Sequence, residues 1–232
     1  MSLFRKRGRA DNEEDASRPE EESAGLRQPA KVFCIGRNKT GTTTMAAALK
    51  LLGYNMPRER QQLPLLDAWA RRDFGPVIEF CRNYDALQDM PFSYPFTFQA
   101  LDQAFPGSKF ILTVRSSADE WYESLTRFHT KLLGTEGVPT MQDLETHPHA
   151  VRWRMLEVQR LMFGADESSL YDRDLYQKHY ERHNETVIDY FRNRSEDLLV
   201  LNLADRRGWD PICQFLERPE PEGVGFPWEN RT

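Results

Sequence analysis

Short apolar runs alternate with amphipathic segments along most of this chain. Three continuous runs, residues 31–35, 109–114 and 198–203, are rich in β-branched, aromatic and leucine residues, as expected for strands buried on both faces. A fourth, shorter segment, residues 84–89, fits a strand that runs into a Met-Pro turn. Because segments with helical spacing separate these runs, the sequence predicts an α/β fold, a three-layer sandwich with a central parallel sheet.

The predicted helices are shorter in the first half of the chain than in the second. They are expected over residues 45–52, 63–72, 76–82, 94–104, 117–133, 149–163 and 172–192. Gly53 is a plausible residue to follow the end of the first helix, and residues 136–140 interrupt the pattern. The last two helices precede the final strand, so we expect residues 135–195 to form a helical cap on the substrate side.

The first 29 residues differ in composition from the rest. Residues 11–22 are acidic, contain Ser and Pro and have almost no apolar side chain, so burial cannot offset the entropy of ordering them. We therefore expect a disordered tail over residues 1–29 and a single domain over residues 30–232.

Charge and cysteine content exclude several classes of protein. The net charge of −5 argues against a general nucleic-acid-binding protein, which needs a basic face. The three cysteines, Cys34, Cys81 and Cys213, show no Cys-x-x-Cys spacing, which favours a reducing compartment. No apolar run is long enough for a transmembrane helix and the N-terminus has no secretory pattern, so we expect a cytoplasmic protein.

A glycine-rich segment, residues 34–44, joins the first predicted strand to the first predicted helix. Gly36 and Gly41 keep the spacing of a nucleotide phosphate loop, but the residue after the second glycine is Thr42, and the lysine is Lys39. Free backbone N–H groups and the positive end of the helix dipole meet at such a turn. The segment therefore predicts a cradle for an anion, with an ammonium group at the turn itself.

This loop resembles the 5′-phosphosulfate loop of the sulfotransferases that use 3′-phosphoadenosine 5′-phosphosulfate (PAPS), a superfamily with a phosphate-loop (P-loop) nucleotide-binding fold. The resemblance implies that Lys39 acts at the bridging oxygen and the leaving phosphate. It implies a cofactor-binding loop made of Arg37 at the mouth, Asn38, Lys39, Thr40, Gly41, Thr42 and Thr43.

A second segment supports the same resemblance. The apolar run 109–114 ends in Arg115, where a Mg²⁺-dependent phosphate-loop enzyme often has a metal-binding aspartate. In the sulfotransferases an arginine at this place and a serine on the next helix share the 3′-phosphate of the nucleotide. Ser124 is the candidate here, nine residues after the arginine instead of eight, and Ser116 and Ser117 remain alternatives.

The C-terminal region is similar to the closing segment of a microbial branch of that superfamily. The run 198–203 is followed by a basic turn, a Gly-Trp pair and a short helix, and then by residues 226–230. The resemblance implies that Arg206, Arg207 and Gly208 cover the 3′-phosphate.

A general base is expected where the short strand ends. Asp89 precedes the Met-Pro turn, at the edge of a parallel sheet that also carries the glycine-rich loop, and it is our first choice. The weaker alternatives are Asp85, four residues earlier, and His129, near the end of the helix after Arg115.

Two other histidines have a spacing that can bind a metal. His179 and His183 are four residues apart on a predicted helix, but the order His-x-Glu-x-His and the lack of a third ligand favour a solvated helix face over a zinc site.

The sequence thus predicts a sulfotransferase that moves a sulfuryl group from PAPS, without a metal, to a hydroxyl or amine of a saccharide or other small molecule. The alternatives are a kinase that uses ATP and Mg²⁺, and a nucleotide-binding module without catalysis. We expect no nucleic-acid partner.

Overall fold

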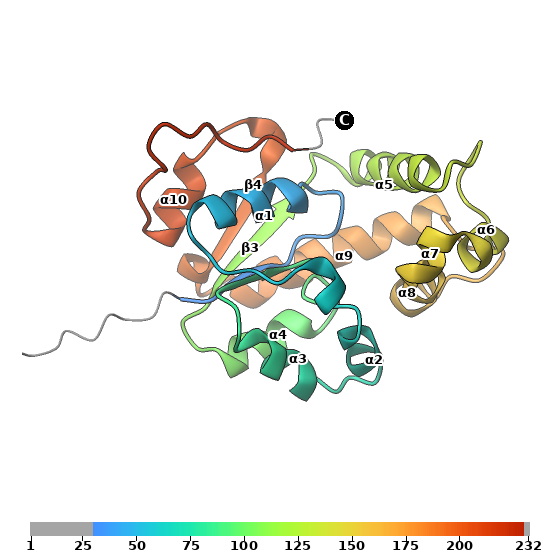
Figure 1. The fold of residues 1–232 in the computed structure, drawn as a ribbon, viewed down its shortest axis with the longest axis horizontal. Coiled ribbons are helices and arrows are strands. Elements are labelled where there is room, and N and C mark those ends of the chain that lie inside the picture. The colour runs from blue at the N-terminus through green and yellow to red at the C-terminus, as the bar shows by residue number, and fades with distance from the viewer. Residues whose placement is uncertain (1–29, 230–232) are drawn as a thin grey trace, which may run out of the picture.

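The structure is a computed structural model that describes residues 30–229. A four-stranded parallel sheet lies at its centre (Figure 1). The strands are β1 (Val32–Cys34), β2 (Ala86–Gln88), β3 (Lys109–Val114) and β4 (Leu198–Asn202), in the order β2-β1-β3-β4. All three pairings are parallel, with Phe33 of β1 opposite both Leu87 and Phe110. The four predicted strands are confirmed. The predicted disordered tail, residues 1–29, lies outside the described residues.

One face of the sheet is covered by α1 (Thr42–Leu51) and α10 (Asp210–Leu216). Val32 and Cys34 of β1 point to this face, because side chains alternate along a strand. They pack with Met45 of α1 and Ile212 of α10 in one buried cluster. Gly53 follows the end of α1 with a φ of 87°, as predicted for a residue after a helix end.

The other face is covered by α3 (Gly75–Cys81), α4 (Thr97–Ala104) and α9 (Arg173–Phe191), with α2 (Leu65–Ala70) beside them. Phe33 and Ile35 point this way and pack with Phe98 of α4 and Phe191 of α9. Two helical layers around one parallel sheet confirm the predicted three-layer α/β sandwich.

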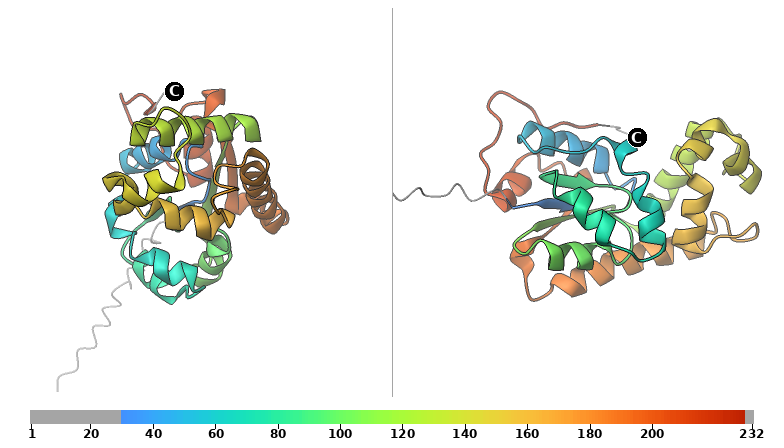
Figure 2. Two further views of the ribbon diagram at one scale, coloured as in Figure 1. Left: turned by 90° about the vertical axis from the view of Figure 1, so that its right-hand side faces the viewer. Right: turned by 60° about the horizontal axis from the view of Figure 1, so that its bottom comes forward.

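A further group of helices lies beside the sandwich: α5 (Ala118–Leu133), α6 (Met141–Thr146), α7 (Pro148–Arg152) and α8 (Met155–Phe163) (Figures 1 and 2). The predicted single helix over residues 149–163 is wrong. It breaks at Arg154, whose backbone is left-handed with a φ of 53°, and whose guanidinium binds Asp67 and Glu157. Helical spacing continues through the break, so periodicity alone did not reveal it.

Short 3₁₀ turns complete the structure: η1 (Glu59–Gln61), η2 (Ser195–Asp197) and η3 (Leu203–Asp205). The long helix α9, predicted as part of a cap, has two roles. Val187 and Phe191 near its end lie in the main core, whereas Tyr176 and Tyr180 near its start pack against α5. No helix within residues 30–229 combines the length and the apolar character needed to cross a membrane.

The carboxyl ends of the four strands meet at one edge of the sheet. The chain leaves β1 toward β2 and then returns past β1 to β3, so the connections diverge between β1 and β3. A crevice at such a point is where open parallel sheets bind their ligands.

Candidate active site

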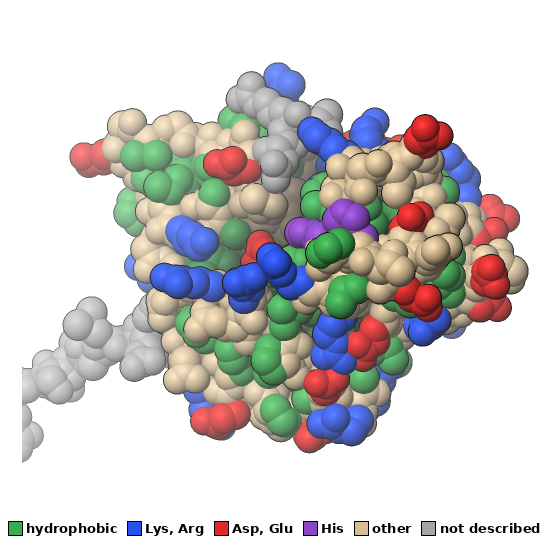
Figure 3. Space-filling model, turned by 45° about the vertical axis from the view of Figure 1, so that its right-hand side comes forward, with side chains coloured by type: hydrophobic (Ala, Val, Ile, Leu, Met, Phe, Trp, Pro, Cys, Tyr) green, Lys and Arg blue, Asp and Glu red, His purple; other side chains and the backbone are tan. Residues whose placement is uncertain are grey.

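A cavity of about 360 Å³ lies at this edge of the sheet. Figure 3 shows that face of the molecule, which is hollowed, with basic, acidic and histidine side chains around the hollow. The loop after β1, the residue after β2 and the residue after β3 form one side of the cavity. α5, α7 and α8 contribute most of the other side, including Phe128, His129, His149, Met155, Val158 and Gln159.

The glycine-rich loop is fixed to the strands around it. The Thr40 hydroxyl lies 2.6 Å from the Thr113 hydroxyl of β3 and 2.5 Å from the carbonyl oxygen of Arg37, to which it donates. Gly41 precedes α1 with a φ of 102°, and a Cβ there would lie 2.3 Å from Leu203 Cδ1, after β4. The loop is therefore held in one shape, and Thr40 contributes its side chain to that shape.

The start of α1 fits an anion. Asn38, Gly41, Thr42 and Thr43 line the cavity, and Thr44 exchanges hydrogen bonds with the backbone of Glu229. The first N–H groups of a helix have no partners within the helix, and the helix dipole adds partial positive charge. Of the predicted members of the loop, all but Arg37 and Thr40 line the cavity.

Lys39 lies at the turn of this loop. Its backbone is left-handed, with a φ of 68°, and Nζ lies 3.7 Å from the centre of the Phe128 ring. Burial lowers the pKa of Lys39, and the charges of Arg115 and Arg127 lower it further. The charge of Asp89 acts in the opposite direction. The ammonium group thus lies near two other cations, one carboxylate and an aromatic face, and the excess of positive charge favours an anionic ligand.

Arg115 links the loop to α5. Its Nε donates to the Lys39 carbonyl oxygen at 2.8 Å, Nη1 binds Glu120 at 3.0 Å and Nη2 lies 3.5 Å from the Ser124 hydroxyl. Arg115 and Ser124 therefore lie side by side, although they are nine residues apart instead of the eight found in many sulfotransferases.

The alternative serines have other partners. Ser117 caps α5 by accepting from the Glu120 N–H at 3.1 Å, and the Ser116 hydroxyl accepts from the Asn202 amide at 3.0 Å. Ser124 is the serine that faces Arg115.

Asp89 lies where β2 ends and lines the same cavity. Its backbone is left-handed with a φ of 63°, and its carboxylate accepts the Met90 N–H at 2.9 Å. Burial raises the pKa of Asp89 to about 6, and the nearby charge of Glu59 acts in the same direction. A carboxylate with a pKa near 6 is a suitable proton acceptor at neutral pH.

The two alternative bases are less suited. Asp85 lies at the opposite end of β2, where its side chain accepts the Asn55 N–H at 3.0 Å. His129 does line the cavity, but its Nδ1 lies 2.8 Å from the Tyr171 hydroxyl. Burial and the charge of Lys39 lower the pKa of His129 to about 4, so it is a weak base.

Arg37 differs from its predicted place at the mouth of the site. Its side chain is buried, and Nη1 donates to the Ser93 carbonyl oxygen at 3.1 Å. Burial lowers the pKa of Arg37 to about 10. Arg37 therefore holds the loop after β1 to the segment before α4 and is not a wall of the cavity.

The predicted solvated face at His179 and His183 is wrong for His183. That ring is buried, with Nε2 2.7 Å from the Ile35 carbonyl oxygen. Within residues 30–229 no group of three or more His, Cys, Asp and Glu side chains is arranged to hold a metal.

The basic turn after β4 begins beside the loop, since Leu203 packs against Gly41, but its cations point outward. Arg206 and Arg207 are exposed, and Arg207 lies 3.9 Å from Asp205. Neither residue, nor Gly208, lines the cavity.

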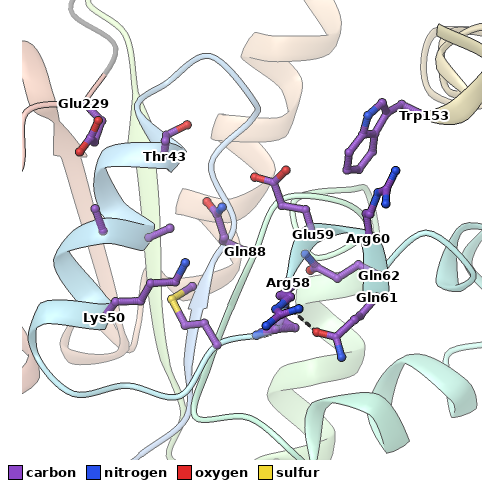
Figure 4. A pocket seen from close by; sticks show the side chains of 14 residues that line it. Thr43, Lys50, Arg58, Glu59, Arg60, Gln61, Gln62, Gln88, Trp153 and Glu229 are labelled. Carbon is purple, nitrogen blue, oxygen red and sulfur yellow. Dashed lines mark hydrogen bonds between the residues drawn. The ribbon is translucent and has the colours of Figure 1, made fainter. Parts of the chain in front are cut away.

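A second hollow of about 830 Å³ adjoins this cavity, between α1 and residues 56–62, and we call it the side groove (Figure 4). The two spaces share Thr43, Glu59, Gln62, Trp153 and Glu229. Three of these residues are not predictable from a motif, because they belong to connecting segments: Glu59, Gln62 and Glu229. The one available signal was the polar run of residues 58–62 between two apolar segments.

Comparison with known proteins agrees with this geometry. The family model described as a sulfotransferase domain matches residues 31–232. A protein of Aspergillus versicolor, described as Ava biosynthesis cluster protein M, is 24% identical over an alignment that covers 83% of this chain and 78% of that protein. The match to the family model spans the sheet, the glycine-rich loop and the helices around the cavity, and the chain belongs to the sulfotransferase domain family.

Proposed function

We propose that this protein transfers a sulfuryl group from PAPS to a hydroxyl or amine of a saccharide or other small acceptor, and that it does so without a metal ion. The observation that carries the proposal is the position of Arg115. Arg115 lies beside the Ser124 hydroxyl and also binds the backbone of the loop that carries Lys39. It therefore connects a pair suited to the 3′-phosphate, Arg115 and Ser124, with the loop suited to the 5′-phosphate.

Each end of the nucleotide would have its own residues. Arg115 and Ser124 would hold the 3′-phosphate, with Arg206, Arg207 and Gly208 closing over it from the turn after β4. The start of α1, with Gly41, Thr42 and Thr43, would hold the 5′-phosphate. Thr40 supports this loop through Thr113, and Asn38 lines the cavity.

PAPS supplies, when bound, an activated sulfuryl group whose S–O bond to the 5′-phosphate breaks as a new bond to the acceptor oxygen or nitrogen forms. Asp89 would take the proton from that acceptor atom. Lys39 would stabilise the negative charge that develops on the departing phosphate. The helices on the far side of the cavity would keep water away.

The kinase alternative is less well supported by the site. In a phosphate-loop kinase a strand beside the loop often ends in a carboxylate that helps to hold Mg²⁺, whereas β3 is followed by Arg115, which lines the cavity. A module without catalysis would not require a carboxylate with a pKa near 6 beside the loop.

The acceptor and the location of the protein are also proposals. The relative from Aspergillus versicolor is described as a biosynthesis cluster protein, which favours a small-molecule acceptor. All three cysteines are unpaired and buried, which supports a reducing, cytoplasmic environment.

Calorimetric titration tests the proposal. The protein is titrated with adenosine 3′,5′-bisphosphate in EDTA and, separately, with ATP and Mg²⁺, using the wild type and Lys39→Ala. We expect the bisphosphate to bind without a metal and to bind more weakly to the variant. Binding of ATP only in the presence of Mg²⁺ would support the kinase instead. Sulfuryl transfer to a phenol that survives Asp89→Asn unchanged would contradict the role of Asp89.

A further inference from the structure

The side groove contains two buried amide groups that lack hydrogen-bond partners. Gln62 is 3% exposed and Gln88 is 6% exposed, and the Oε1 atom of each has no partner among residues 30–229. In Figure 4 both side chains point into the space between α1 and residues 56–62. Gln88 comes from the end of β2, whereas Gln62 comes from the segment before α2.

Such an arrangement costs stability. A buried carbonyl oxygen without a partner destabilises the folded protein, and folded proteins keep few of them. Of the five buried side-chain oxygens without a partner among residues 30–229, these two lie at one hollow beside a candidate active site, where a ligand can supply the missing partners. Because an amide oxygen accepts hydrogen bonds, the ligand must present donors at these two places.

Other side chains in the groove narrow the chemistry of the ligand. Glu59 adds a carboxylate that points into the groove, and the half-buried Trp153 ring lies at its side (Figure 4). Amide and carboxylate oxygens suit hydroxyl groups, and an indole ring suits the apolar face of a saturated ring. A phenol acceptor without further hydroxyl groups would leave both amide oxygens without partners.

Gln62 also lines the cavity that contains Lys39 and Asp89. Glu59 lines both spaces as well, so a molecule whose reacting group lies near Asp89 would meet Gln62 and Glu59 first and reach Gln88 with its more distant parts. The groove is placed to bind the body of an acceptor while one group of that acceptor reacts.

We propose that the side groove binds the non-reacting part of a polyhydroxylated acceptor, and that Gln62 and Gln88 determine specificity by accepting hydrogen bonds from its hydroxyl groups. This inference rests on the proposed sulfuryl-transfer function and selects, among the acceptors open to it, ring compounds with several hydroxyl groups.

The test uses the full chain, PAPS and a panel of acceptors: methyl β-D-glucopyranoside, methyl β-D-galactopyranoside and myo-inositol against cyclohexanol. The variants are Gln62→Met and Gln88→Met, which remove the amide at similar volume. Gln99→Met on α4 is the matched control, because its Oε1 is also buried without a partner but it lines neither space.

We expect at least one polyol to be sulfated with a kcat/KM about tenfold or more above that of cyclohexanol, since one well-placed hydrogen bond accounts for a factor of that order. Gln62→Met and Gln88→Met should each reduce that preference, mainly by raising the KM of the polyol. Their affinity for adenosine 3′,5′-bisphosphate should stay unchanged, and their melting temperatures should stay equal or rise. Gln99→Met should keep the preference.

Two results would overturn the inference: no polyol preferred over cyclohexanol, or a preference that survives both variants. If the bisphosphate binds and cyclohexanol or 4-nitrophenol is sulfated, either result removes this inference and leaves the proposed function intact. If the bisphosphate does not bind at all, the proposed function fails and the inference fails with it.

Discussion

The guanidinium of Arg115 donates through Nε to the backbone carbonyl oxygen of Lys39 at 2.8 Å. The same group lies 3.5 Å from the Ser124 hydroxyl, so one side chain connects the turn of the glycine-rich loop with α5. In the proposed complex, the residues that bind the 3′-phosphate are therefore in direct contact with the loop that binds the 5′-phosphate. Changes at Arg115 should therefore affect both the 3′-phosphate and the position of Lys39.

Arg115→Lys keeps the positive charge but loses the planar group that reaches several partners at once. We expect the affinity for adenosine 3′,5′-bisphosphate to fall by about tenfold to a hundredfold, as loss of a charge-assisted contact predicts. The affinity for adenosine 5′-monophosphate, which lacks the 3′-phosphate, should fall less. Calorimetry with the two nucleotides measures the difference, and Ser124→Ala should show the same selectivity. Equal losses for both nucleotides would mean that Arg115 only supports the loop.

Asp89→Asn should lower kcat by about 10²–10⁴-fold, the usual contribution of a positioned general base, with little effect on nucleotide binding. Asparagine tolerates the left-handed backbone at this position, which makes it a milder change than alanine. Because the pKa of Asp89 is raised to about 6, wild-type kcat/KM should fall as the pH drops through about 6. The pH–rate profile of the variant should lack that acidic limb, and its persistence would assign the base elsewhere.

The same carboxylate should reduce stability at neutral pH. A carboxyl group whose pKa is about 6 when folded and about 3.9 when unfolded binds its proton more tightly in the folded protein. Its contribution to stability is therefore lost as the pH rises from about 4 through 6. Asp89→Asn should raise the melting temperature at pH 7 relative to the wild type, and the gain should shrink at pH 4. A gain that is the same at both pH values would show that ionisation is not its cause.

The sequence allowed the sheet, the loop and the place of Asp89 at the edge of the sheet to be predicted, because each depends on local signals. Apolar runs mark the strands, glycine spacing marks the loop, and the parallel sheet brings the ends of β1, β2 and β3 together. Arg37 and His183 could not be placed in this way, since their burial depends on contacts with Ser93 and Ile35 that are distant in sequence. Gln62 and Gln88 belong to no motif at all.

His129→Asn tests whether a histidine contributes to the pH dependence. Because burial lowers the pKa of His129 to about 4, the ring is neutral throughout the range in which Asp89 is expected to titrate. We expect the variant to keep the acidic limb near pH 6, with a change in kcat of less than about tenfold. Tyr171→Phe, which removes the hydroxyl bound to His129, is the companion variant. If the acidic limb of the pH–rate profile moved by a full pH unit in either variant, His129 would have a direct role in proton transfer.

Gly41→Ala tests how tightly the loop is held between α1 and the turn after β4. Two separate problems meet at this position: the φ of 102° is unfavourable for any residue with a Cβ, and that Cβ would lie 2.3 Å from Leu203 Cδ1. We expect the substitution to destabilise the protein by about 1–3 kcal/mol, measured by chemical denaturation, and to weaken binding of adenosine 3′,5′-bisphosphate.

The double variant Gly41→Ala, Leu203→Ala removes the collision but leaves the backbone strain. It should therefore recover part of the loss in nucleotide affinity relative to Gly41→Ala alone. Full recovery would show that the backbone adapts at no cost, and no recovery would show that the contact with Leu203 is unimportant for the shape of the loop. Gly53→Ala is the matched control, because Gly53 has a φ of 87° but nothing within 4 Å of the added Cβ. It should lose stability without losing nucleotide affinity.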